Sequence, residues 1–176
     1  YLPYGIGCAL IKDKQAHLNS FSSETAYMQH NQIWFSDLGI ELSRGFRALK
    51  AWLCLKMYGL NHFTRLIERD VEKAKYLERL VKNNPKLKLM APVFLNIVCF
   101  RYVDDHSNEE MLNKLTKRII ASLQFEGKVF PSETIIDGKS VIRVSVTNYR
   151  SKEEDFDLLV EKVVHLGDRL IQRLSG

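Results

Sequence analysis

The stretch Thr134–Val146 reads TIIDGKSVIRVSV in one-letter code. Runs rich in β-branched residues lie on both sides of Asp137-Gly138, and such runs are typical of strands. Asp-Gly between two runs of this kind is a strong signal for a two-residue hairpin turn, because both turn positions need a positive φ. The stretch therefore predicts two antiparallel strands, residues 134–136 and 141–146.

Helices are predicted on both sides of this hairpin. One capping box, Ser107 with Glu110, starts a helix before it, and a second box, Ser151 with Glu154, starts a helix after it. The apolar face of the earlier helix consists of Leu112, Leu115, Ile119 and Leu123. The apolar face of the later helix consists of Phe156, Leu159, Val160, Val163, Leu170 and Leu174.

The region before residue 107 adds a strand and a long helix. Residues 97–100 are an apolar strand candidate, and residues 60–82 carry apolar side chains at the i, i+3, i+4 spacing of an amphipathic helix. From about Lys50 onward the order is two helices, strand, helix, hairpin and helix. This order predicts an α+β layer, a small antiparallel sheet with helices on one face.

The first part of the chain is less regular. Residues 8–11 predict a short buried strand, and Asp13 can cap a short helix that ends at Phe21. Residues 22–40 have no clear period and are rich in Ser, Asn, Gln and His. Irregular loops of this length are uncommon in compact chains and are often functional.

Ser43 can cap a helix over residues 44–58, which Gly59 ends. The apolar residues of this segment cover most of the helix circumference, whereas its charges Arg44, Arg47 and Lys50 share one stripe near the start. A helix that is apolar nearly all round is expected to be packed on several sides.

Composition limits the class of protein. The chain has 176 residues with 45% hydrophobic and 27% charged residues, which is typical of a globular domain and excludes wholesale disorder. Charged residues interrupt every apolar run before the roughly 18 residues of a membrane span, so we expect no membrane partner. The net charge is +5, but acidic and basic residues are interleaved at helical spacing, which favours solvated helix faces over nucleic-acid binding.

Cysteine and histidine usage points away from a metal site. The three cysteines form no CxxC pair and lie within apolar runs, and the five histidines are scattered. We expect buried, reduced thiols in a cytoplasmic protein, and no bound metal.

Two places can carry chemistry on residue type alone. Tyr27 is a phenol in the long polar loop and can act as a general acid, although a phenol that anchors the loop is the more common arrangement. The predicted helix start at Leu42-Ser43-Arg44 combines free N–H groups, a hydroxyl and a guanidinium, which together can hold an anion. An ordinary capped helix with a surface arginine is the more frequent alternative there.

The stretch Leu42–Trp52, LSRGFRALKAW, resembles a block of the pyridoxal-phosphate-dependent group II amino-acid decarboxylases. This family includes the aromatic amino acid, histidine, tyrosine and glutamate decarboxylases. Further stretches resemble the family in the same order, and they are residues 1–9, 26–28, 95–101, 143–148 and 153–155. The resemblance covers essentially the whole chain.

The resemblance implies an α/β protein, the C-terminal part of a fold-type-I transferase that works as a homodimer with pyridoxal 5'-phosphate (PLP). Residues 1–49 would end the large PLP-binding domain and include its lid loop, and residues 50–176 would form the small α+β domain. The cofactor would form a Schiff base with a lysine that we expect just before Tyr1, in a longer polypeptide. The residues that bind most of the cofactor are expected before Tyr1 as well.

The resemblance also implies roles for individual residues. Tyr27 matches the loop tyrosine that protonates the substrate Cα after CO₂ leaves, and Tyr4 matches a position lining the substrate pocket. Leu42 and Ser43 match substrate-binding positions near the subunit interface, and Arg44 matches the arginine beside them. A tyrosine at position 27, in place of phenylalanine, favours amine formation over the oxidative, aldehyde-forming reaction of some relatives.

Some features depart from the family pattern. Gly45 stands where a second arginine is frequent, Gly5 stands where an acidic residue is common, and the loop after Tyr27 is shorter than in animal aromatic decarboxylases.

The first hypothesis for the function is that this chain is part of an L-amino-acid decarboxylase. In this hypothesis the 176-residue segment alone is inactive. The alternatives are a noncatalytic interaction or dimerisation module derived from that fold and, more weakly, a basic nucleic-acid binder.

Overall fold

The computed structural model describes residues 1–21 and 32–174. Contacts divide the chain into two compact units, Tyr1–Phe63 and Thr64–Gly176. Within the described residues, no helix is both long enough and apolar enough to cross a membrane.

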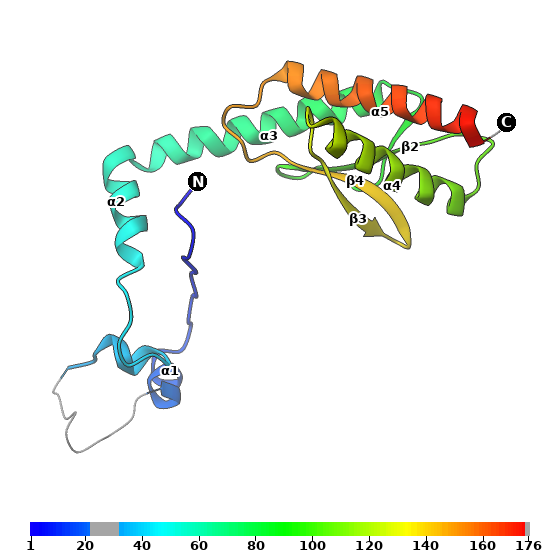
Figure 1. Ribbon diagram of the computed structural model, residues 1–176. Helices are drawn as coiled ribbons and strands as arrows, with labels where there is room; N and C mark the ends of the chain where they lie inside the picture. The colour runs from blue at the N-terminus through cyan, green and yellow to red at the C-terminus, as the bar shows by residue number, and fades with distance from the viewer. Residues whose placement is uncertain (22–31, 175–176) are drawn as a thin grey trace. The chain divides into compact units, whose positions relative to one another are not determined.

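The second unit is built on a four-stranded antiparallel sheet with strand order β1-β2-β4-β3 (Figure 1). The strands are β1 Leu87–Leu89, β2 Ile97–Tyr102, β3 Ser132–Ile136 and β4 Lys139–Ser145. The helices are α3 Leu60–Lys82, of which residues 64–82 belong to this unit, α4 Glu109–Glu126 and α5 Glu153–Leu174. The predicted α+β layer is confirmed. Among the described elements of this unit, β1 alone was not expected from the sequence, since three residues are too few to show an alternating pattern.

The hairpin forms as its sequence predicts. Asp137 has φ 48° and Gly138 has φ 74°, so both turn residues lie in the left-handed region that the Asp-Gly pair favours. The pairing runs from Ile136 opposite Lys139 to Ser132 opposite Arg143. On its other edge β4 pairs with β2, which makes β4 a central strand.

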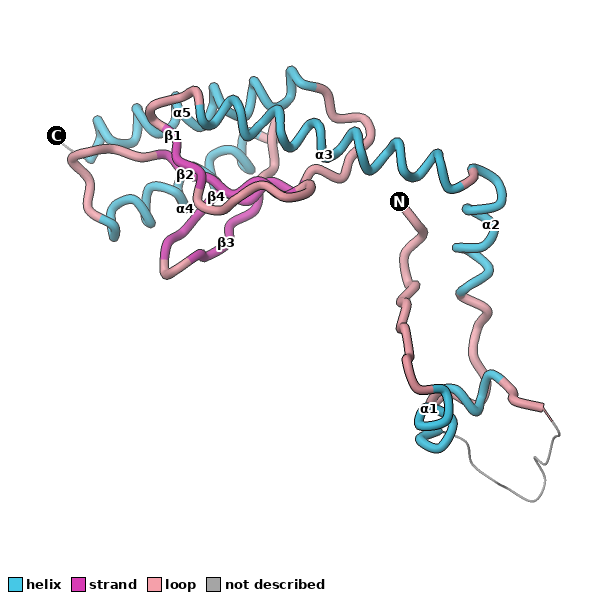
Figure 2. Tube along the Cα trace, turned by 180° about the vertical axis from the view of Figure 1, so that it is seen from behind, coloured by secondary structure: helices cyan, strands magenta, loops and turns pink. Residues whose placement is uncertain are grey.

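All three helices pack against one face of this sheet (Figure 2). Every second residue of β2, namely Val98, Phe100 and Tyr102, belongs to the same buried cluster as helix residues. The helices contribute the largest part of that cluster, and their fully buried members are Ala74, Leu77, Val81, Leu115, Ile119, Leu123 and Val163. Alternation along the strand therefore selects the face that the helices cover.

The predicted core faces are largely correct. The four apolar residues predicted for α4 are all buried, and so are Phe156, Leu159 and Val163 of α5. Val160 and Leu170 are partly buried against the same cluster, and the side chain of Leu174 lies outside the described set. In α3 burial is confined to the segment from Asp70 onward, whereas Ile67 is 53% exposed.

The predicted capping box of α4 is wrong by one residue. The N-cap is Asn108, whose Oδ1 accepts a hydrogen bond from the Met111 N–H at 2.9 Å. The Ser107 hydroxyl instead donates to the Asp104 carboxylate at 2.7 Å. Asparagine and serine cap almost equally well, so residue type alone does not decide where the helix starts.

The start of α5 is also displaced by one residue from the predicted Ser151–Glu154 box. The helix begins at Glu153, and the Asp155 carboxylate accepts from the Lys152 N–H at 2.9 Å. An aspartate in the first turn satisfies a free N–H and also complements the helix dipole.

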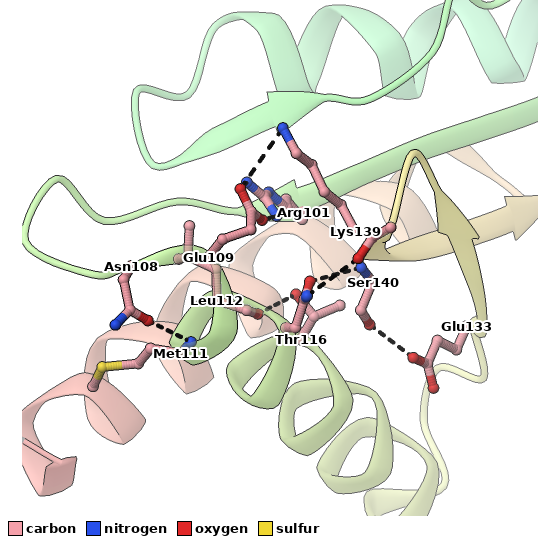
Figure 3. A network of polar contacts seen from close by, with 11 residues as sticks. Arg101, Asn108, Glu109, Met111, Leu112, Thr116, Glu133, Lys139 and Ser140 are labelled. Carbon is pink, nitrogen blue, oxygen red and sulfur yellow. Dashed lines mark hydrogen bonds and ion pairs between the residues drawn. The ribbon is translucent and has the colours of Figure 1, made fainter.

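A polar network ties β2 and the hairpin to the start of α4 (Figure 3). Arg101 is only 4% exposed, and its guanidinium donates to both carboxylate oxygens of Glu109, at 3.2 Å for the Nη2–Oε2 pair. Lys139 Nζ lies 3.7 Å from Oε2 of the same carboxylate. The hydrogen bond from Arg101 is the main reason that the pKa of Glu109 is lowered. The Glu109 carboxylate thus compensates the positive charge of a guanidinium that is almost completely buried.

A second polar cluster joins β2, α5 and the residue before β1. The Tyr102 hydroxyl donates to the Asp168 carboxylate at 2.7 Å, and Lys86 Nζ lies 2.7 Å from both oxygens of that carboxylate. Burial and the hydrogen bond to Asp168 raise the pKa of Tyr102 far above its usual value. Burial alone would raise the pKa of Asp168, but the hydrogen bonds from Lys86 and Tyr102 outweigh it, so that pKa is lowered.

The lowered pKa makes the stabilising effect of Asp168 depend on pH. A carboxyl group whose pKa is lower in the folded state stabilises fully above its unfolded pKa of about 4 and loses this effect as pH falls through the folded pKa. We expect Asp168→Asn to destabilise the protein at neutral pH, and the difference from wild type to shrink below about pH 4. Urea unfolding of both proteins between neutral pH and a pH below about 4 measures this difference in the free energy of unfolding. Asp105→Asn, the same change at an exposed site, should show no such trend; a constant difference for Asp168→Asn would contradict the assignment.

The first unit contains α1 Lys14–Phe21, the short 3-10 helix η1 Phe35–Leu38 and α2 Ala48–Tyr58. Asp13 caps α1 as predicted, because its Oδ1 accepts from the Ala16 N–H at 2.9 Å. The strand predicted for residues 8–11 is wrong. These residues are extended and exposed, and in the described part of the chain no strand lies beside them to pair with their backbone.

The predicted start of α2 is wrong as well. The helix begins at Ala48, four residues later than predicted, and Ser43 does not cap it. Gly45 disfavours helix, and its carbonyl accepts from the Arg47 N–H at 2.8 Å in a tight turn before the helix. The apolar side chains of α2 are not packed on several sides; in this chain Trp52 is 55% exposed and Met57 is 73% exposed.

Candidate functional site

The sequence-predicted substrate residues all lie in the first unit and are exposed. Tyr4 is fully exposed, Leu42 is 62% exposed, and Ser43 and Arg44 lie beside it on the same exposed segment. Tyr27 lies outside the described residues. The structure therefore keeps Leu42, Ser43 and Arg44 together by chain connectivity, without enclosing them in a cavity.

One contact connects the two parts of this predicted site. Lys50, in the first turn of α2, donates from Nζ to the backbone carbonyl of Tyr4 at 3.3 Å. The contact joins residues 46 positions apart and holds the N-terminal segment against the helix that follows Arg44. Sequence reasoning placed Lys50 only on a charged stripe and did not single it out.

The idea of an anion site at a helix start needs correction. The free N–H groups of α2 begin near Ala48, so they do not gather at Ser43 and Arg44. What these two residues still offer is a hydroxyl and a guanidinium, both of which bind carboxylate or phosphate oxygens.

A groove of about 480 Å³ lies in the second unit, and sequence reasoning missed it. It is lined by the α4–β3 connection, the end of β4 and the start of α5, and we call it the Arg143 groove. Its lining includes the buried Phe156 and Leu159 and also Phe130, which is 77% exposed. The only signal in the sequence is a single arginine inside an apolar strand run.

The charges of the Arg143 groove suit an anionic group next to an apolar one. Lys128 and Arg143 both line it, and neither forms an ion pair within the described residues. Asp155 also lines the groove, and its negatively charged carboxylate accepts a hydrogen bond from the Lys152 N–H. Guanidinium and ammonium groups without a carboxylate partner are free to bind a carboxylate or phosphate.

The thiols do not form a reactive or metal-binding set. Cys99 is buried, and burial raises the pKa of its thiol even though the charge of Arg143 acts in the opposite direction. Cys8 is exposed and Cys54 is partly exposed, so the prediction that all three are buried is wrong for this chain. In the residues that the structure describes, no group of three His, Cys, Asp or Glu side chains is placed to hold a metal ion.

Comparison with known proteins extends over most of the chain. The family model of the pyridoxal-dependent decarboxylase conserved domain matches residues 2–103. An aromatic-L-amino-acid decarboxylase of Bacillus atrophaeus is 29% identical over 97% of this chain and 37% of its own length. Tyrosine decarboxylase 2 of Narcissus pseudonarcissus is 31% identical over 84% of this chain and 31% of its own length.

A solved structure gives the same result for the fold. The tryptophan decarboxylase of Catharanthus roseus in complex with L-tryptophan matches with a TM-score of 0.74 and 26% identity, over 87% of this chain and 33% of that chain. The present chain spans about a third of the length of the relatives it matches. Since the family model covers more than half of its residues, the chain belongs to the pyridoxal-dependent decarboxylase family.

Proposed function

We propose that the complete protein is a PLP-dependent carboxy-lyase that removes CO₂ from an L-amino acid and forms the corresponding amine. The observation that carries this proposal is the family match over residues 2–103. The aromatic-L-amino-acid and tyrosine decarboxylases among the similar proteins support an aromatic substrate class. In this proposal residues 1–49 end the large cofactor domain, and residues 50–176 form the small domain.

The residues of this chain fit a supporting role toward PLP. The Ser43 hydroxyl and the Arg44 guanidinium have the chemistry to bind a phosphate or carboxylate, but both are exposed and form no enclosed cradle. Bound PLP would act as an electron sink for the negative charge that the departing CO₂ leaves at Cα. We propose that residues elsewhere in the polypeptide hold most of the cofactor.

This chain would contribute proton delivery and substrate binding. Tyr27 would give a proton to the substrate Cα, since a phenol with a pKa of about 10 remains protonated at neutral pH. Tyr4, Leu42 and Ser43 would line the substrate pocket. The Arg143 groove is also suited to a carboxylate, the group common to all amino acids.

We further propose a cytoplasmic homodimer. The resemblance to the group II decarboxylases supports a dimer, and so do the apolar side chains that α2 exposes, including Trp52 and Met57. Apolar patches of this kind are typical of surfaces that another part of a protein covers. Light scattering on the full-length protein should give twice the mass of one polypeptide.

Product analysis tests the proposed function. The full-length protein with PLP is expected to release CO₂ and form amine from at least one of tyrosine, DOPA, tryptophan, glutamate and diaminobutyrate. The matched control is the same protein without PLP, and chromatography of the amines gives the substrate. If all five substrates give no amine while the protein still dimerises, the noncatalytic dimerisation module becomes the better description.

A further inference from the structure

A lysine joins the N-terminal segment of the first unit to α2. Lys50 lies in the first turn of α2, and its Nζ donates to the backbone carbonyl oxygen of Tyr4 at 3.3 Å. A hydrogen bond from an ammonium group to a carbonyl is charge-assisted and therefore stronger than one between two neutral groups. The N-terminal segment and the segment that leads into α2 run alongside each other in both views (Figures 1 and 2).

Backbone hydrogen bonds hold the helix end of this contact. The Gly45 carbonyl accepts from the Arg47 N–H at 2.8 Å, and the Arg47 carbonyl accepts from the Lys50 N–H at 3.2 Å. These bonds fix the backbone from which the Lys50 side chain extends. The same stretch of chain leads directly back to residues 42–44, so the position of Lys50 is linked to theirs.

At its other end the contact fixes a piece of backbone that belongs to no strand. Residues 1–11 form no strand in the described chain, so no ladder of hydrogen bonds holds them. Gly5 has φ 80°, in the left-handed region, and the chain bends there directly after Tyr4. The Tyr4 ring is fully exposed, so packing within the described chain does not determine where it lies. The position of the ring therefore depends on the backbone to which Lys50 is bound.

This contact connects two parts of the proposed substrate site that are far apart in the sequence. Tyr4 and the pair Leu42 and Ser43 are proposed to line one pocket. A substrate side chain that lies between them requires a fixed distance between the two segments. Lys50 provides it, because it follows Ser43 closely along the chain and binds the Tyr4 backbone. A pocket that is ordered before its ligand arrives binds more tightly, since less freedom is lost on binding.

We propose that Lys50 is a positioning residue of the substrate pocket, which holds Tyr4 at a fixed distance from Leu42 and Ser43 through the hydrogen bond from Nζ to the Tyr4 carbonyl. This inference rests on the proposed decarboxylase function. Lys50 itself touches neither substrate nor cofactor in this role. Its effect is to strengthen the binding of the amino-acid substrate, and the chemical step does not depend on it.

Kinetic constants separate this role from a general effect on stability. Loss of an interaction that supports ground state and transition state equally raises KM and leaves kcat unchanged. Loss of folded protein lowers the apparent kcat and leaves KM unchanged, because the molecules that remain folded bind substrate normally.

The experiment measures kcat and KM of the full-length, PLP-loaded protein with the amino acid that it decarboxylates fastest. Lys50→Met keeps the apolar stem but removes the donor, and KM is expected to rise about three- to tenfold, the usual effect of losing one hydrogen bond. Lys50→Arg retains a charged donor of similar reach and is expected to keep the wild-type KM.

A double-mutant cycle tests whether Lys50 acts through Tyr4. Tyr4→Ala removes the side chain but keeps the carbonyl that Lys50 binds, and this variant should itself raise KM. In the Tyr4→Ala background, Lys50→Met is expected to raise KM no further, because no ring remains to be positioned. An increase of full size in that background would overturn the proposal.

Lys14→Met is the matched control for Lys50→Met. It makes the same change at an exposed position of α1, in the same unit, and should leave KM unchanged. A wild-type KM in Lys50→Met, even with a lower kcat, would contradict the positioning role. If Lys50→Met does not fold, Lys50→Gln gives the same comparison, because its amide reaches one bond less far than Nζ. Wild-type protein that forms no amine from any of the amino acids tested would instead overturn the proposed function, and this inference with it.

Discussion

Replacing Tyr27 by phenylalanine in the full-length protein is expected to lower amine formation about 10²- to 10⁴-fold, the usual size of one general-acid contribution. Phenylalanine keeps the aromatic ring but has no proton to donate to Cα. Cofactor binding should be unchanged, because Tyr27 is not proposed to hold PLP. Steady-state amine production and the absorbance of the bound cofactor measure the two effects separately.

Tyr149→Phe is the matched control for this variant. Tyr149 is an exposed tyrosine of the second unit, and its hydroxyl contacts only the neighbouring Arg150 in the described chain. The same loss of a hydroxyl there should leave amine formation unchanged. Amine formation at the wild-type rate by Tyr27→Phe would remove Tyr27 from the mechanism.

Replacing Gly167 by alanine is expected to destabilise the second unit by about 3 kcal/mol, near the upper end for overpacked cores. A Cβ atom at this position would lie 2.2 Å from Cδ2 of Tyr102, far inside van der Waals contact. The Tyr102 ring cannot move aside without losing its hydrogen bond to Asp168. Urea unfolding followed by far-ultraviolet circular dichroism measures the change.

Two further variants isolate this steric effect. Gln172→Ala, an exposed change on the same helix, should have little effect, because alanine is as good a helix former as glutamine. In a Tyr102→Ala background, Gly167→Ala should cost nothing further and can even stabilise, since it improves helix propensity. A full penalty in the absence of the ring would show that the clash with Tyr102 is not the cause.

The sequence predicts the second unit well because its signals are local. Asp137-Gly138 determines the turn type, and apolar periodicity determines which faces of α4 and α5 are buried. The capping boxes were each displaced by one residue, since other polar contacts form at the two helix starts: the Ser107 hydroxyl donates to Asp104, and the Asp155 carboxylate accepts from the Lys152 N–H. Such contacts depend on geometry that spacing alone does not contain.

The first unit was harder to predict, because none of its described apolar residues is buried in this chain. Residues 8–11 and the helix α2 have the composition of buried elements, yet in this chain they are exposed. An apolar composition predicts that a segment is buried, but it does not identify the surface that buries it. The Arg143 groove was missed for a related reason, since residues from three separate elements build it.

The exposure of α2 has a spectroscopic consequence. The chain contains two tryptophans, Trp34 and Trp52, and both lie in the first unit, at 51% and 55% exposure. Fluorescence excited selectively at tryptophan therefore comes entirely from residues 1–63. Any surface that covers α2 will transfer the Trp52 indole from water to an apolar environment and shift its emission to shorter wavelengths. The protein thus contains an intrinsic fluorophore that reports its own assembly.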